Sequence, residues 1–376
     1  MRYSTYLEEP TLESYRLDHC PRDGLAPVLI CWWVNVTGQS GATYNVMRAV
    51  QLPQNGTSMN FGAYRGTGVL DEPGALLYSF REHPAIEPYW VEQGDEALVY
   101  AGTSFRLALG VHDYSWSEAS GRIRLGARRL GQACTFWVPR QDGFAHPVLS
   151  RSHFAKVSGT IDNDPVEGIF MVDNIYSRPG LTFRETQFTT KLHNYWMDWL
   201  VEYDDGGHEG GFAWRGQPGT GFAAAHHIVD GRSRARSDAR IEVARTERGT
   251  MESVELSLGQ ELRIVFEQHG SYDWPIHTYG TAVPGAGSRK VVKSWNYSEN
   301  FPLNWGLVEE HQATHAALYG RYPSLQHLLR GARVTNGALS FASSPTTGAM
   351  PAPGNDRHPV GSTASAVAAH RPALPG

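Results

Sequence analysis

The chain has 376 residues, 41% of them hydrophobic and 19% charged, so it holds enough apolar material to bury a core, which excludes a disordered protein. Its 33 Lys and Arg residues against 38 Asp and Glu residues give a net charge of -5 with no long run of one sign, so nucleic acid is not an expected partner. No stretch approaches the roughly 20 apolar residues that span a bilayer, and the N-terminal sequence lacks a signal-peptide pattern, so we expect a cytoplasmic protein with no membrane span.

The composition favours many short strands joined by tight turns, because 40 Gly and 22 Pro accompany 11 Trp, 17 Tyr and 14 Phe. Alternating apolar and polar residues predict half-buried strands at 122–127 and in a hairpin that turns at 259–260. The more continuously apolar runs at 28–36 and 105–111 predict strands covered on both sides. In chain order we predict strands near 28–37, 43–52, 58–65, 75–80, 97–101, 104–111, 121–129, 133–138, 153–161, 166–174, 195–204, 210–216, 222–229, 239–246, 251–258, 261–268, 277–283 and 289–297.

These strands divide most simply into two β domains, at 1–150 and 151–334. The second domain is predicted to end in short helices between 306 and 331, where Leu318, Tyr322, Leu325 and Leu329 recur at helical spacing. Residues 335–376 are rich in Ala, Pro, Gly, Ser and Thr, which is typical of a disordered tail.

Several signatures of catalysis and cofactor binding are missing from the sequence, including the phosphate loop, the nucleophile elbow and the zinc helix, and we expect no cofactor. The glycines of 216–221 lie between two predicted strands and are read as a hairpin turn. The three cysteines lack disulfide or zinc spacing, and His311 and His315 are more simply explained as a solvated helix face. We therefore expect no metal.

The densest run of functional-looking residues is 158–231, and its motifs resemble a known family. Gly168, Asp173, Asn174, Tyr176 and Ser177 are similar to the Gly-x-x-x-x-Asp-His-x-Trp-Gly stretch of tandem lipocalin-like proteins, the superfamily of carotenoid 1,2-hydratase (hydroxyneurosporene synthase) and AttH-like proteins, with His replaced by Asn and Trp by Tyr. The runs 304–309 and 31–36 resemble its late Gly-Trp-Gly-x-x-Glu motif and its early aromatic strand. The resemblance covers roughly residues 25–310.

The resemblance implies two lipocalin- or calycin-like antiparallel β-barrels or sandwiches packed together, with an aromatic-lined cavity for a lipophilic small molecule. A closed sheet of eight strands can hold one small ligand, although core packing remains the simpler explanation for any single Trp. The expected substrate-binding residues are Trp33, Asn174, Arg178, Trp196, Trp199, His226 and Trp305.

Asp173 is the first candidate for catalysis. Burial among aromatic side chains would raise its pKa, so that it could stay protonated and donate to an alkene or a carbonyl group. Tyr176 is the candidate second donor, and Glu309 the candidate base or orienting group. The alternatives for Asp173 are a carboxylate that caps backbone amides at a strand end, or an ion pair with Arg178.

The sequence thus predicts an enzyme that hydrates, isomerises or cyclises a terpenoid- or polyketide-like molecule without a cofactor. A carrier that binds a lipophilic ligand in the same cavity without turning it over is the main alternative. A carbohydrate-active β-sandwich is the third, because Trp and Tyr stack on sugars and Asp204 and Asp205 are paired carboxylates, although hairpin chemistry explains that pair sufficiently.

Overall fold

The computed structural model describes residues 1–52, 56, 58–78, 83–84, 86–273, 276–283 and 289–300, and the backbone of 332–335 and 338–341. By its internal contacts the chain divides into one unit, Met1–Phe341, and a second, Ala342–Gly376. Trp305, Glu309 and the helices predicted at 306–331 lie outside the described residues. Most of the segment predicted to be a disordered tail, 335–376, lies outside them too. The exceptions are Thr335, which ends strand β24 (Ala332–Thr335), and strand β25 (Ala338–Phe341), which pairs with β24.

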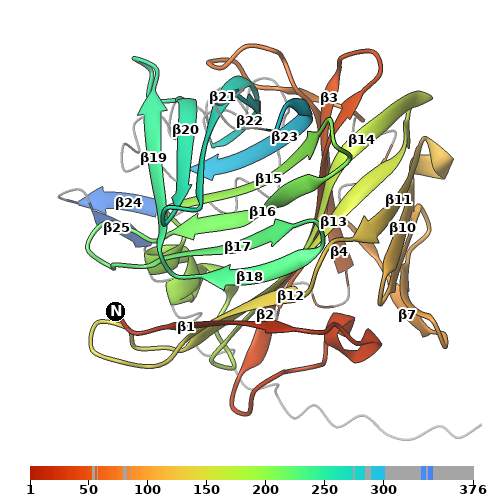
Figure 1. Cartoon of the computed structure of the whole chain (residues 1–376). Coiled ribbons are helices and arrows are strands. Elements are labelled where there is room, and N and C mark those ends of the chain that lie inside the picture. The colour runs from red at the N-terminus through yellow and green to blue at the C-terminus, as the bar shows by residue number, and fades with distance from the viewer. Residues whose placement is uncertain are drawn as a thin grey trace, which may run out of the picture. The chain divides into compact units, whose positions relative to one another are not determined.

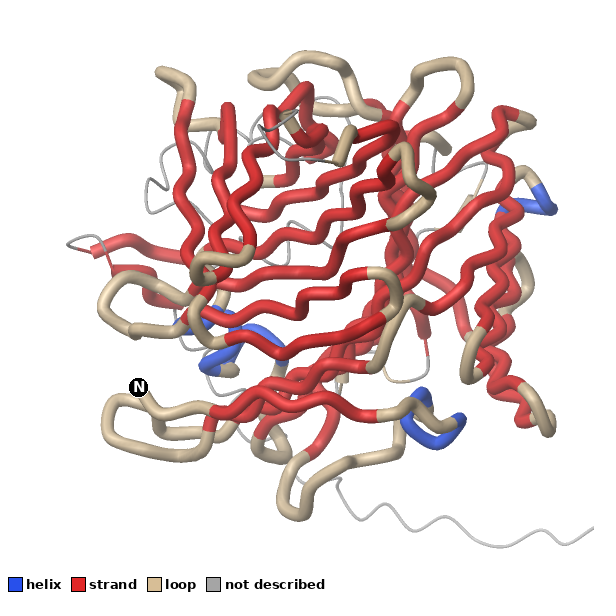
Figure 2. The backbone as a smooth tube through the Cα atoms, in the orientation of Figure 1, coloured by secondary structure: helices blue, strands red, loops and turns tan. Residues whose placement is uncertain are grey.

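The first unit is mainly β, as predicted, and its two large sheets are antiparallel throughout (Figures 1 and 2). The first sheet has 14 strands, and its main path runs in the order β5-β4-β3-β2-β14-β13-β11-β10-β9-β8-β7, with β1, β6 and β12 attached beside it. Its strands are β1 (Ser4–Glu8), β2 (Ala26–Gly38), β3 (Thr43–Gln51), β4 (Ser58–Arg65), β5 (Ala75–Leu76), β6 (Ile86–Pro88), β7 (Trp90–Gln93), β8 (Ala97–Ala101), β9 (Phe105–Gly110), β10 (Asp113–Glu118), β11 (Ile123–Arg129), β12 (Ala133–Val138), β13 (Val148–Ile161) and β14 (Asp164–Ser177).

The second sheet has nine strands in the order β18-β17-β16-β15-β23-β22-β21-β20-β19. It curls into a nearly closed barrel, since β19 returns against β16 and β17. Its strands are β15 (Tyr195–Tyr203), β16 (His208–Arg215), β17 (Ala223–Val229), β18 (Arg232–Arg236), β19 (Ala239–Arg245), β20 (Met251–Leu258), β21 (Leu262–Asp273), β22 (His277–Ala282) and β23 (Val291–Asn300). Four single helical turns complete the described structure: η1 (Leu12–Tyr15), η2 (Ala119–Gly121), η3 (Phe183–Glu185) and η4 (Phe188–Leu192).

Strand pairing changes from the first sheet to the second between Ser177 and Tyr195. The first sheet therefore runs beyond residue 150, because β13 and β14 extend it through the region where we placed the start of a second domain. The division into two domains stays a prediction.

The long strand β2 separates two buried regions, because successive side chains point to opposite faces of a sheet. Trp32 and Val34 pack into the core of the first sheet together with Tyr100, Trp116 and Phe170. The alternate residues of β2 face the other way, into an apolar cluster that the two sheets share. The apolar run 28–36 was predicted to be a strand covered on both sides. This prediction is confirmed, because both faces of β2 are buried there.

Strand β15 repeats this arrangement in the second sheet. Tyr195, Met197 and Trp199 fill the inside of the nearly closed barrel, while Trp196 and Leu200 face the first sheet. The interior of this barrel is therefore filled by buried side chains along β15.

The core of the first sheet also holds a buried cluster of charges. Arg48 is fully buried; its Nε donates to Glu118 Oε2 at 2.8 Å and its Nη2 donates to Glu87 Oε1 at 2.8 Å. The guanidinium carbon lies 3.7 Å from the centre of the Phe105 ring, and the Nε2 of His83 lies 2.7 Å from Glu118 Oε1. Paired in this way, the carboxylates avoid the cost of an isolated charge in an apolar core.

Candidate active site

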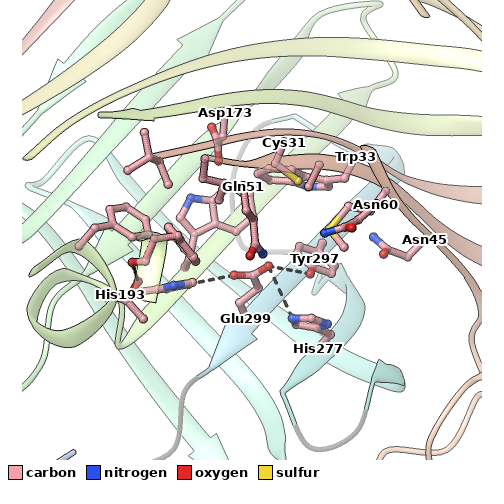
Figure 3. Close-up of a pocket in the computed structure, with 18 of the residues that line it drawn as sticks. Cys31, Trp33, Asn45, Gln51, Asn60, Asp173, His193, His277, Tyr297 and Glu299 are labelled. Carbon is pink, nitrogen blue, oxygen red and sulfur yellow. Dashed lines mark hydrogen bonds and ion pairs between the residues drawn. The ribbon is translucent and has the colours of Figure 1, made fainter. Parts of the chain in front are cut away.

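A cavity of about 120 Å³ lies between the two sheets (Figure 3). A cavity of about 150 Å³ holds a benzene molecule, so this one is on the scale of a single ring or somewhat smaller. Most of its wall is aromatic or aliphatic, with a few polar groups that converge on the space. The lining residues are Leu29, Cys31, Trp33, Asn45, Met47, Ala49, Gln51, Asn60, Tyr64, Asp173, Ile175, Phe183, Phe188, Thr189, His193, Trp196, Trp214, His277, Tyr297 and Glu299.

Strand register places the two carboxyl groups on opposite walls of this cavity. On the first sheet Asp173 pairs with Cys31, which pairs with Ala49, so the three lie side by side across β14, β2 and β3. On the second sheet Glu299 sits in one cross-strand row with Trp214, Trp196 and His277, through the pairings of β16, β15, β23 and β22. Each wall therefore presents a single carboxyl group among neighbours that carry no carboxylate.

Asp173 is a buried acid. Burial raises the pKa of Asp173 to about 7, against an opposing effect of the Ser152 hydroxyl and with an added rise from the negative charge of Glu299. Its Oδ1 atom has no hydrogen-bond partner among the residues that the structure describes. Near neutral pH the group is therefore in part protonated and can donate a proton into the cavity.

Glu299 has the opposite character. Burial alone would raise its pKa, but the hydrogen bond from His193, the nearby His277 imidazole and the hydrogen bond from Tyr297 outweigh burial and lower the pKa to about 2. The His193 Nε2 atom lies 2.9 Å from Glu299 Oε2, the Tyr297 hydroxyl donates to Oε1 at 2.8 Å, and His277 Nε2 lies 3.6 Å from Oε1 (Figure 3). Glu299 is thus a fixed anion in an apolar space.

The loop between the sheets brings His193 to this carboxylate. Thr182 begins the turn η3 and its backbone N–H donates to Glu185 Oε2 at 2.9 Å, which fixes the entry of the chain. Phe188 then buries its ring against Trp214, with ring centres 4.7 Å apart, and His193 follows directly after η4. The apolar side chains of this loop therefore hold the imidazole in the wall of the cavity.

A third carboxyl group, that of the fully buried Asp198, lies behind the wall. Burial raises the pKa of Asp198 well above its usual range, although the Trp33 indole donates to its Oδ2 at 3.3 Å. The Trp33 and Trp196 rings meet edge to face with centres 5.0 Å apart. Asp198 does not line the cavity, and its role is to hold Trp33, which does.

Three of the predicted site residues meet at the cavity: Asp173, Trp33 and Trp196. The alternative in which Asp173 forms an ion pair with Arg178 is not seen, since Arg178 is exposed and no such pair is found within the described residues. The roles of these residues in binding and catalysis stay predictions.

Other predicted site residues point elsewhere. Asn174 follows Asp173 on β14 and so faces the opposite side, where its Nδ2 donates to the Ser14 carbonyl at 3.1 Å. Tyr176 is buried with Leu25 and Leu149 on that same side, beyond a bulge in the strand.

Trp199 and His226 also lie away from the cavity. Trp199 fills the inside of the second barrel. His226 is buried beside Phe212, its Nε2 lies 2.9 Å from the Ser233 hydroxyl, and it does not line the cavity. Its neighbour His227 points into the barrel toward Glu209, so the two histidines face opposite sides, as strand geometry predicts.

Sequence reasoning missed Glu299, His193 and His277. The alternation Trp295, Tyr297, Glu299 was a usable signal, because it continues one face of the strand that we ended at 297. No comparable signal marks the two histidines, which sit at a loop end and at the first residue of β22.

The remaining candidates are explained by local structure. Asp204 and Asp205 follow β15 in an exposed turn, and Asp205 receives two hydrogen bonds from Arg289, both at 3.0 Å. Within the residues that the structure describes, no three His, Cys, Asp or Glu side chains are placed to hold a metal ion. None of the described helices is long and apolar enough to cross a membrane.

Comparison with known proteins finds similar solved structures, while no family model and no curated protein matches the chain. An AttH-like protein from Nitrosomonas europaea is 12% identical at a TM-score of 0.39, over 73% of this chain and 93% of that one. CghA with Sch210972 is 9% identical at 0.39, over 73% and 88%, and kievitone hydratase from Nectria haematococca is 6% identical at 0.37, over 73% and 89%. The resemblance to AttH-like proteins stated from the sequence is thus found again in the comparison of structures. Identities of 12% or lower and TM-scores below 0.5 assign no reaction to this chain.

Proposed function

We propose that the chain is an enzyme that protonates a lipophilic, ring-bearing small molecule in the cavity between its sheets, in a hydration, isomerisation or cyclisation. One observation carries the proposal: a single apolar cavity holds a carboxyl group with a pKa of about 7, Asp173, and another with a pKa of about 2, Glu299. Two titratable groups whose environments push their pKa values apart are the usual mark of divided acid and base roles.

In the proposed reaction Asp173 gives its proton to one carbon of a double bond and becomes a carboxylate. The positive charge that develops on the neighbouring carbon is stabilised by the Glu299 carboxylate and by the faces of Trp33 and Trp196. A base then removes a proton from the adjacent carbon, which completes an isomerisation, or from a water molecule that adds, which completes a hydration.

Glu299 is too weakly basic to be that base, because its pKa of about 2 leaves it a poor proton acceptor near pH 7. The imidazoles at its side, those of His193 and His277, also line the cavity, and imidazole is the side chain that most often serves as a general base. Glu299 therefore orients them and supplies the negative charge.

The first test is to identify the ligand. Native mass spectrometry of the gently purified protein, with analysis of its organic extract, should reveal a lipophilic molecule in stoichiometric amount. Turnover of that molecule by wild type and by Asp173→Asn then tests the chemistry, because the amide keeps the shape of the side chain and cannot give up a proton in this range. The proposal expects retained binding with turnover reduced by about 10² to 10⁴.

Two results would count against it. Equal turnover by wild type and Asp173→Asn removes Asp173 from the mechanism. Stoichiometric binding with no turnover of the bound molecule by wild type favours the alternative of a carrier, which needs the cavity and no acid.

A further inference from the structure

The wall that the first sheet gives to the cavity contains one row of residues with a polar group at each end. The strand register pairs Asp173 with Cys31, Cys31 with Ala49, and Ala49 with Asn60, across β14, β2, β3 and β4. All four residues line the cavity, and paired residues of neighbouring strands point to the same face of a sheet. This Asp173–Asn60 row therefore carries a carboxyl group at one end and an amide at the other.

The middle of the row is lower than the wall beside it. The neighbouring rows hold larger side chains, Met47 and Trp33 on one side and Gln51, Leu29 and Ile175 on the other. Among the described residues with which the first sheet lines the cavity, alanine and cysteine are the smallest. A flat ring can therefore lie closer to the backbone along this row than elsewhere on the described wall.

The length of the row suits one ring. Four strands span three spacings of about 4.8 Å, so the Cα atoms of Asp173 and Asn60 are about 14 Å apart. A hydrogen bond or a proton-transfer contact takes about 3 Å at each end, which leaves about 8 Å for the ligand. The cavity volume of about 120 Å³ is on the same scale of a single ring.

The Asn60 amide can recognise an uncharged oxygen atom. Its side chain is buried, and an amide has two donor and two acceptor positions, so it can bind a ligand hydroxyl or carbonyl group while it keeps a protein partner. An amide does not titrate near neutral pH, so this recognition does not depend on the protonation of the cavity's histidines.

We propose that the ligand lies along the Asp173–Asn60 row, with an uncharged hydroxyl or carbonyl oxygen at Asn60 and the bond to be protonated at Asp173, on opposite sides of one ring. Ala49 then determines specificity, because it forms the floor under the ring. The inference rests on the proposed function in placing the ligand in this cavity and the reacting bond at Asp173. The binding of the oxygen at Asn60 is tested without any reaction.

The probes are p-cresol and toluene, which have one ring each and differ by one hydroxyl group. Their dissociation constants are measured at pH 7 by ligand-observed NMR titration, where the phenol is uncharged because its pKa is about 10. We expect wild type to bind p-cresol at least as tightly as toluene, since a hydrogen bond to Asn60 offsets the cost of dehydrating the hydroxyl group.

The variant Asn60→Leu leaves that hydroxyl group without its partner. The dissociation constant of p-cresol divided by that of toluene should rise at least fivefold, the effect of one ordinary hydrogen bond. Asn45→Leu is the matched control, because Asn45 also lines the cavity but pairs with Tyr64, in a row that does not contain Asp173. This control should leave the ratio within a factor of two of wild type. Asn60→Ala gives the same comparison if Asn60→Leu does not fold.

Two variants of Ala49 test the path of the ring independently of Asn60. Ala49→Leu fills the floor of the row, and the affinity for both probes should fall at least tenfold because the ring has no space. Ala49→Ser adds one oxygen atom and keeps most of the space, so both affinities should stay within threefold of wild type.

The proposal is overturned if wild type binds neither probe, if replacing Asn60 leaves the ratio unchanged, if Asn45→Leu raises it as much, or if Ala49→Leu binds both probes as wild type does. A ratio that depends on Asn60, without turnover of any bound molecule, supports this mode of binding and contradicts the proposed reaction. Turnover that depends on Asp173, with a ratio that does not respond to Asn60, does the reverse.

Discussion

The raised pKa of Asp173 has a consequence for stability that needs no substrate. The pKa is about 7 in the folded protein and starts from 3.8 for an unperturbed aspartate. Between pH 4 and pH 7 the unfolded chain releases the proton of Asp173, whereas the folded protein keeps it. Ionisation therefore favours the unfolded chain, and the free energy of unfolding falls as pH rises from about 4 to about 7. The contribution of Asp173 to stability is complete below the pKa of the unfolded chain and is lost above the pKa of the folded protein. The variant Asp173→Asn has no such loss, since an amide does not titrate there.

The size of the effect follows from the pKa values. Between pH 5 and the folded pKa of about 7 lie two units, and each unit corresponds to about 1.4 kcal/mol. The free energy of unfolding of wild type, minus that of Asp173→Asn, should therefore fall by about 2 to 3 kcal/mol between pH 5 and pH 8. Taking the difference cancels the other titrating groups, such as Glu299 and the histidines, to the extent that the substitution leaves them unchanged.

Urea denaturation of both proteins at pH 5, 6, 7 and 8, followed by tryptophan fluorescence, measures this difference. We expect most of the change between pH 5 and 7 and little above pH 8, where Asp173 is ionised in both states. Parallel curves for the two proteins would refute the reasoning, because they would mean that Asp173 titrates alike in the folded and unfolded chain. The group would then have no protonated form to offer at neutral pH.

Three further predictions concern other groups. Turnover of the identified ligand should fall as pH rises through about 7, because the acid form of Asp173 is lost, and a pH–rate profile that is flat from pH 6 to 8 would contradict this. Asp198→Ala should unfold about 1 to 3 kcal/mol more easily than Asp198→Asn in urea, since only the amide keeps an acceptor for the Trp33 indole, and equal midpoints would show that the bond contributes nothing. Arg48→Met should lower the free energy of unfolding by about 3 to 5 kcal/mol, because it leaves Glu118 without its cation in the core, and a loss below 1 kcal/mol in the same assay would contradict that role.

Most strands could be predicted from the sequence, because burial imposes a repeating pattern of apolar residues along them. Strand β2 has a continuous run of apolar residues because both of its faces are buried. Strands β20 and β21 alternate apolar and polar residues because one face is buried. Strand β18 (RSRAR) was missed because its side chains are mostly charged, and β7 because its residues are all exposed. Such edge strands are held by backbone hydrogen bonds that leave no pattern in the side chains.

The candidate site was only partly readable. Asp173, Trp33 and Trp196 stood in recognisable aromatic strands, whereas His193 depends on how a loop packs between two sheets, and such long-range packing has no local signature. The cavity itself was expected inside a barrel. It lies between the sheets, and large side chains such as Trp199 fill the inside of the barrel. The sequence does not show which face of a strand packs inside the barrel and which packs against the other sheet.

The pairing of β2 with β14 also bears on how the protein folds. Cys31 and Asp173 are neighbours in the sheet although 142 positions separate them in the chain (173 minus 31), so this wall forms only after a long loop has closed. The opposite wall comes from residues that follow later still, up to Glu299. A partly folded chain therefore lacks a complete binding site for the ligand. The recovery of ligand binding during refolding reports the final assembly of the two sheets and not the formation of either sheet alone.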